Sequence, residues 1–221
     1  MMGAETTPLF LSRLLLDPRS PRVQRELSDP YQMHRSIMRA FPDDLESDEE
    51  RVLFRVGCAR GTSQYTLLVQ SWSRPDWSRL VEDEGARGYL LDTEEPNPSV
   101  KEFAPRLRPG QVLAFRLRAN PTIKRKGKRL GLYQPEEQMG WLARKAKQGG
   151  FRLLSARESG EEVLRGVAGR DSQSQHLRLL SVQFDGLLHV EDPQRLRRAV
   201  EEGIGSGKGF GFGLLSLARP A

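Results

Sequence analysis

The order of the predicted strands and helices limits most strongly the folds open to this 221-residue chain. The first half follows the order strand, helix, strand, strand, helix, strand, which is that of a ferredoxin-like domain and of RNA-recognition motifs, and a similar pattern restarts in the second half. The segment from Asp92 to Ser99 holds two prolines and three acidic residues and separates the halves. The pattern therefore predicts an α+β protein of two tandem ferredoxin-like domains with antiparallel sheets, residues 1–97 and 98–221.

In the first half, apolar runs bounded by turn residues predict strands, and one helix has a clear beginning. Asp29 suits the N-cap of that helix, Pro30 its first position, and Gln32 the acceptor position of a capping box. The elements expected are strands at 9–16, 51–57, 65–71 and 89–91, a helix at 29–40, and a short helix after residue 76.

In the second half, helices are expected to begin at Pro135 and after Asp192, and glycines follow both of them. Asp185 and Gly186 are a typical hairpin pair, so we expect a turn between two strands there. The elements expected are strands at 111–119, 151–154, 176–184, 187–190 and 212–217, helices at 135–148 and 192–203, and a mobile loop or hairpin at 160–175.

The composition favours a polyanionic partner. The net charge is +6 and the pI about 9.8, a balance typical of nucleic-acid-binding proteins, although a basic protein that binds none fits it too. The sequence has no run of eighteen apolar residues, so neither a membrane span nor a membrane partner is expected. Cys58 is the only cysteine, which excludes an intrachain disulfide and favours a cytoplasmic location.

The cations are concentrated in one segment. Five of the six residues from 124 to 129 are basic, and strand-like segments flank them. The glycine among them predicts a flexible loop between strands, suited to binding phosphates. The candidate RNA-binding residues of this loop are Lys124, Arg125, Lys126, Lys128 and Arg129.

Tyr31 and His34 lie three residues apart on one face of the helix at 29–40, and Arg35 lies four residues after Tyr31. RNA cleavage without a metal needs a base for the 2′-hydroxyl, an acid for the 5′-oxygen and a positive charge near the phosphate. Histidine can transfer protons near neutral pH, tyrosine can orient a hydroxyl, and a helix N-terminus attracts anions. The alternative interpretation packs Tyr31 in the core and leaves His34 on the surface.

A series of alternating glycines near the C-terminus includes Gly205, Gly207 and Gly209, with Lys208 between them. Such glycines let an RNA backbone approach closely, and consecutive amides can bind anions. The series is not a P-loop, because Glu202 stands where that motif requires glycine. The alternative interpretation is a plain turn into the last strand.

Metal and serine chemistry have little support in the sequence. His34, His176 and His189 are the only histidines, and none has the spacing of zinc ligands. No GxSxG motif for a serine nucleophile occurs. We therefore expect no metal site and no cofactor.

Three of these motifs together resemble the CasE family, the repeat-processing endoribonucleases of the type I-E CRISPR Cascade complex. They are the helix opening Asp29-Pro-Tyr-Gln-Met-His-Arg35, the strand Phe115-Arg-Leu-Arg-Ala-Asn-Pro121 and the glycine segment 203–216. They follow one another in the order found in CasE proteins, and the resemblance extends over residues 9–218.

The resemblance implies two tandem ferredoxin-like domains and metal-independent cleavage of precursor CRISPR RNA just 3′ of the repeat hairpin. The 2′-hydroxyl would attack the adjacent phosphate and leave a 2′,3′-cyclic phosphate. By position in the motif, Tyr31 and His34 would be the catalytic pair and Arg35 an RNA contact. The basic loop would contact the hairpin. The implied partners are the repeat hairpin, the mature crRNA that the enzyme retains, and other Cascade subunits.

Two other functions remain open. A non-catalytic RNA-binding module of a ribonucleoprotein would keep the basic loop and the glycines and use Tyr31 and His34 structurally. A metal-dependent nuclease would lose its activity in a chelator. The histidine on the capped helix favours the metal-independent enzyme.

Overall fold

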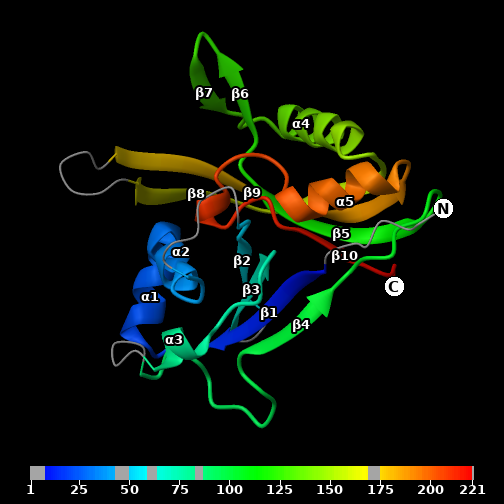
Figure 1. The fold of residues 1–221 in the computed structure, drawn as a ribbon. Coiled ribbons are helices and arrows are strands. Elements are labelled where there is room, and N and C mark those ends of the chain that lie inside the picture. Colours follow the sequence, from blue (N-terminus) through cyan, green and yellow to red (C-terminus); the bar gives the residue numbers. More distant parts are fainter. Residues whose placement is uncertain (1–7, 43–49, 59–63, 83–86, 169–174, 221) are drawn as a thin grey trace.

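The computed structural model describes residues 8–42, 50–58, 64–82, 87–168 and 175–220. These residues form two four-stranded antiparallel sheets, each with helices on one face, and a two-stranded hairpin that projects from the second sheet's domain (Figure 1). No helix among the described residues is long and apolar enough to cross a membrane.

The first domain is built on a strand whose leucines alternate between buried and half-exposed positions. Leu14 and Leu16 are fully buried and pack with Ile37 and Trp77 from the helical layer. The indole nitrogen of Trp77 donates a hydrogen bond to Ser12 Oγ at 3.0 Å, so this buried polar pair is satisfied. The elements are β1 (Leu9–Leu16), α1 (Pro21–Ser28), α2 (Pro30–Met38), β2 (Leu53–Cys58), β3 (Tyr65–Ser71), α3 (Ser78–Val81) and β4 (Ser99–Phe103).

The end of this domain differs from the prediction. The strand expected at 89–91 is wrong, because Tyr89 turns into the core and Leu90 makes one isolated bridge to β1. The fourth strand is instead β4, which pairs with β1 and completes the sheet order β2-β3-β1-β4. β4 lies beyond the boundary expected after residue 97, so the first sheet extends to Phe103.

The second domain repeats the same order of elements. Its helices α4 and α5 cover one face of the sheet β10-β5-β9-β8 (Figure 1). Each sheet thus has the first and third strands of its unit at the centre, which confirms the prediction of two tandem ferredoxin-like domains. The elements are β5 (Val112–Ala119), β6 (Thr122–Arg125), β7 (Lys128–Gly131), α4 (Pro135–Gln148), β8 (Phe151–Ala168), β9 (Gln175–Val190), α5 (Pro193–Glu202), the 3₁₀ helix η3 (Lys208–Phe210) and β10 (Leu215–Ala218).

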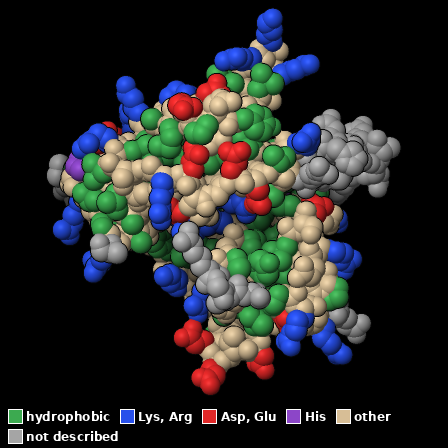
Figure 2. Space-filling model, turned by 180° about the vertical axis from the view of Figure 1, so that it is seen from behind, with side chains coloured by type: hydrophobic (Ala, Val, Ile, Leu, Met, Phe, Trp, Pro, Cys, Tyr) green, Lys and Arg blue, Asp and Glu red, His purple; other side chains and the backbone are tan. Residues whose placement is uncertain are grey.

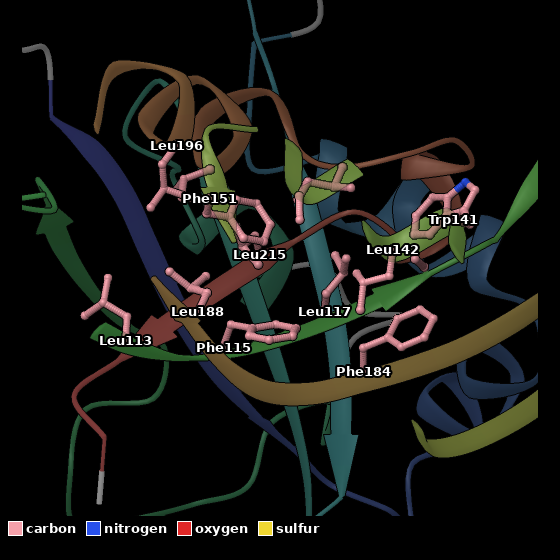
Figure 3. Packing of buried hydrophobic residues seen from close by; sticks show 14 of the residues in the cluster. Leu113, Phe115, Leu117, Trp141, Leu142, Phe151, Phe184, Leu188, Leu196 and Leu215 are labelled. Carbon is pink, nitrogen blue, oxygen red and sulfur yellow. The ribbon is translucent and has the colours of Figure 1, made fainter. Parts of the chain in front are cut away.

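Aromatic and leucine side chains fill the core of the second domain (Figure 3). The Trp141 ring of α4 stacks on Phe184 of β9 with 6.4 Å between ring centroids. Leu117 and Leu142 are fully buried beside them. Burying a side chain of this size contributes about 1.5–3 kcal/mol, so these contacts are what hold α4 on the sheet.

The turn expected at Asp185 and Gly186 is wrong, since β9 runs through both residues without a break. The Asp185 carboxylate accepts a hydrogen bond from Arg116 Nε at 2.5 Å, across the neighbouring strand. A Cβ at Gly186 would lie 2.1 Å from the Ser155 carbonyl oxygen, so a side chain cannot fit there. Asp185 and Gly186 therefore allow β9 to pair closely with the strands on either side of it. Residues 169–174, part of the loop expected at 160–175, lie outside the described residues, and β8 continues to Ala168.

Buried polar contacts join the two domains. Gln70 Nε2 of β3 donates to the Val200 carbonyl oxygen of α5 at 2.7 Å. The Arg55 guanidinium of β2 donates to Ser216 Oγ of β10 at 3.0 Å. Burial and the nearby charge of Arg116 lower the pKa of Arg55 to about 10. These contacts bring the glycine segment of the second domain against α2 of the first.

Candidate active site

The site is a groove along α2. Asp29 caps the helix, its carboxylate accepting from the Tyr31 amide at 3.1 Å, and Pro30 occupies the first helical position as predicted. Tyr31, His34 and Arg35 line the groove, so the structure brings together all three residues expected on this helix. Its volume of about 1080 Å³ exceeds that of a usual small-molecule site and leaves room for a nucleotide chain.

Two aromatic rings fix the histidine and the tyrosine. The His34 ring lies nearly parallel to Phe54 of β2, with 6.1 Å between centroids and 10° between planes. The Tyr31 ring stacks on Phe210 of η3 at 5.9 Å and 30°. Phe54 belongs to the first domain and Phe210 to the second, so the two domains meet beside Tyr31 and His34, although the described residues that line the groove itself all belong to α1, α2 or their caps. Sequence reasoning missed both rings, because nothing local marks an aromatic residue as the neighbour of a distant helix.

The glycine segment closes over His34. A Cβ at Gly209 would lie 3.5 Å from His34 Cδ2, so η3 covers one side of the imidazole. Gly207, just before η3, has a φ of 79°, a left-handed conformation that favours glycine. Gly205 instead packs on Trp141, where an added Cβ would lie 3.0 Å from the indole. Of the three glycines expected to contact RNA, Gly209 is therefore the one beside the histidine.

Burial lowers the pKa of His34 below its usual value of 6.5. The ring nitrogen Nδ1 is buried and has no hydrogen-bond partner among the described residues. The imidazolium form would need acceptors for both ring N–H groups, whereas the neutral ring needs one. The surroundings therefore favour the neutral imidazole over the imidazolium.

Arginines make the groove cationic. Arg25, Arg35 and Arg39 line it, and Arg39 follows Arg35 by one helical turn on α2. Arg39 was recoverable from its i+4 spacing, whereas Arg25 belongs to α1, a helix that the sequence analysis missed although Pro21 stands at its first position. Guanidinium groups bind phosphates in a fixed fork geometry, so this lining suits an RNA backbone.

A buried network supports the groove from beneath. Glu26 of α1 is 4% exposed, and its carboxylate accepts from Arg22 Nε at 2.9 Å and from Ser36 Oγ at 2.5 Å. The Tyr89 hydroxyl donates to the same carboxylate at 2.5 Å. Burial and the Glu26 charge raise the pKa of Tyr89 far above its usual value, so the hydroxyl remains a donor. Since Ser36 follows His34 by two residues, the network fixes α2 against α1.

Lys208 lies outside this groove. The lysine is half-buried, and burial together with Arg51 lowers its pKa. It is thus a weaker candidate for a direct phosphate contact than the arginines of the groove.

The basic segment 124–129 is a regular hairpin instead of a flexible loop. β6 and β7 pair through it, with Lys124 opposite Arg129 and Arg125 opposite Lys128, and Lys126 and Gly127 form the turn. All five cations are exposed, and blue side chains project from this end of the molecule (Figure 2). The hairpin stands apart from α2 (Figure 1), so the structure places these candidates on a second surface.

Within the described ranges, no three His, Cys, Asp or Glu side chains come together as a metal site requires.

Tandem ferredoxin-like domains with a cationic groove and an exposed basic hairpin define a class of nucleic-acid-binding proteins, and the buried histidine adds a proton-transfer group to it. Residues 9–219 match the family described as CRISPR associated protein. The chain therefore belongs to this family, which confirms the resemblance on which the sequence analysis rested.

Two named relatives and one solved structure are also similar to this chain. The CRISPR-associated endoribonuclease Cse3 of Thermus thermophilus is 39% identical to this chain. The alignment covers 95% of this chain and all of Cse3. Cascade subunit CasE of Escherichia coli is 30% identical over 86% of this chain and 92% of its own length. A structure of Thermus thermophilus Cse3 bound to an RNA representing a pre-cleavage complex matches with a TM-score of 0.82 and 38% identity, covering 96% of this chain and all of Cse3.

Proposed function

We propose that this protein is a metal-independent endoribonuclease that cuts precursor CRISPR RNA at the 3′ base of the repeat hairpin. His34 carries the proposal: its pKa is lowered by burial, and it lies in a groove lined by arginines. The endoribonuclease name of the Thermus relative and its RNA-bound structure support the substrate class.

In the proposed reaction, neutral His34 takes the proton of the 2′-hydroxyl, which attacks the adjacent phosphate. The bond from phosphorus to the 5′-oxygen breaks as the His34 imidazolium returns the proton to that oxygen, so the products carry a 2′,3′-cyclic phosphate and a 5′-hydroxyl. Tyr31 orients the attacking hydroxyl, and Arg35 with Arg39 stabilises the charge that develops on the phosphate. The β6–β7 hairpin binds the stem of the repeat through its phosphates, since A-form RNA is recognised largely by shape and backbone.

After cleavage, the enzyme retains the mature crRNA. It remains in Cascade together with that product, as the Cascade subunit name of the Escherichia coli relative suggests. Processing of the precursor and membership of Cascade both belong to the cytoplasm.

The test is incubation of the purified protein with a labelled cognate repeat hairpin in excess chelator, followed by sizing and end-group analysis. A single cut that leaves a 2′,3′-cyclic phosphate is expected. Tight binding without a cut would favour a non-catalytic RNA-binding module, and cleavage that disappears in chelator would favour a metal-dependent nuclease.

A further inference from the structure

The tyrosine that follows the basic hairpin has no place in either core or in the α2 groove. Tyr133 lies between β7 and α4 and is 55% exposed. Its ring atoms Cε2, Cζ and Oη lie 3.2, 3.3 and 3.4 Å from the position that a Cβ at Gly131 would occupy. The absence of a side chain at Gly131 thus lets the ring rest against the backbone of β7.

Charges on the two sides of Tyr133 differ in sign. The hairpin before it carries five exposed cations, and Glu136 and Glu137 are exposed at the start of α4 just after it. Cations attract the phosphate backbone, whereas the two carboxylates repel phosphates and can accept hydrogen bonds from base amino groups. The part of an RNA that suits this position is therefore a base.

We propose that Tyr133 is a stacking platform for an unpaired base of the RNA that the β6–β7 hairpin binds. The inference rests on the proposed function, because it requires an RNA on this hairpin. Aromatic side chains take up splayed-out bases in single-stranded loops and ends. A ring already held by the backbone loses little conformational freedom on binding.

The experiment uses the full-length protein and its cognate repeat RNA, with 2-aminopurine placed at each unpaired position in turn. Wild-type protein should quench the fluorescence of one position. Tyr133→Ala should abolish that quenching and weaken RNA binding roughly tenfold. Tyr133→Phe should keep both, because stacking requires the ring and not the hydroxyl.

Gly131→Ala supplies a matched second variant. The added methyl group displaces the Tyr133 ring without removing it, so partial loss of quenching and of affinity is expected. Neither residue lines the His34 groove, and a thermal unfolding transition at the wild-type temperature shows that both alanine variants are folded.

The outcomes separate the two proposals. Wild-type protein that neither binds nor cuts the repeat RNA would refute the proposed function and the platform together. Cleavage by the wild type with no quenched position, or equal RNA affinity of wild type and Tyr133→Ala, overturns the platform alone. Unchanged RNA affinity with poorer incorporation of Tyr133→Ala into Cascade also overturns it, and assigns the ring to a protein interface.

Discussion

Burial favours the neutral form of His34, because the Phe54 ring and the glycine segment at Gly209 keep water from two sides of the imidazole. Desolvation disfavours the imidazolium, and the described residues offer its buried nitrogen no acceptor. A residue held in this form can act as a base without first losing a proton. At the scale of single residues, the proposed chemistry therefore depends on burial more than on neighbouring charge.

Replacing His34 by alanine should slow cleavage by about 10²–10⁴-fold, the usual contribution of a general acid or base. RNA binding should change less than about threefold, because the arginines of the groove and the basic hairpin remain. Single-turnover cleavage and a binding titration measure the two effects. His189→Ala, a histidine on β9 of the other domain, is the control; equal losses in both variants would remove His34 from its role.

The rate should also follow the protonation of His34. A base acts in its neutral form, and the His34 pKa is lowered, so cleavage should be independent of pH near 7 and fall about tenfold per unit once the pH drops below that pKa. Bound phosphates favour the imidazolium, so the inflection for the RNA complex should lie at higher pH than that for the protein alone. A rate that instead rises as the pH falls below 7 would assign His34 the role of acid.

At the scale of elements, α2 keeps its position through the carboxylate of Glu26. Glu26→Ala removes the acceptor of three donors and the carboxylate that pairs with the mostly buried guanidinium of Arg22, so stability should fall by about 3 kcal/mol in urea unfolding. Tyr89→Phe removes one donor and should cost about 1 kcal/mol. Equal losses in the two variants would show that the network contributes nothing beyond the tyrosine.

The β6–β7 hairpin should set the salt dependence of RNA binding. Replacing Arg125 and Lys128 by alanine removes the cross-strand pair nearest the turn. Each phosphate contact adds about 1 to the slope of log K against log salt, so the slope should decrease by about 2. Lys101→Ala, at an exposed position of β4, should leave the slope unchanged. An unchanged slope in the hairpin variant would place the RNA on another surface.

The sequence predicted an element correctly where residues close to it in the chain determine its conformation, and failed where distant residues do. α2 and α5 begin where an aspartate cap and a proline predicted them, and α4 begins at the predicted Pro135, because these signals act between neighbours in the chain. Asp185 and Gly186 misled the same reasoning, since a distant arginine and the backbone of β8 decide their conformation. The candidate site divided likewise: Tyr31, His34 and Arg35 share a helix face, whereas Phe54 and Phe210 meet them through tertiary packing.

At the scale of the whole molecule, His34 is enclosed because the two domains are docked. α2 supplies His34, and η3 of the other domain covers it. The buried side chains of Arg55 and Gln70 make hydrogen bonds across the interface. An unpaired buried polar group is costly, so these bonds specify one relative orientation of the sheets.

Gln70 is the sharpest test of this docking. Val200 lies in the last turn of α5, where backbone carbonyls lack partners within the helix, and the Gln70 amide satisfies its carbonyl. Gln70→Leu leaves that buried carbonyl without its donor and should lower the free energy of unfolding by about 1–3 kcal/mol.

For Gln70→Leu, we expect one cooperative thermal transition at a lower temperature, together with slower cleavage, because η3 is then held less firmly over His34. Gln194→Leu, at an exposed position of α5, should alter neither. Two separate transitions, only one of them shifted by Gln70→Leu, would show that the domains unfold independently and that the enclosure of His34 does not require their docking.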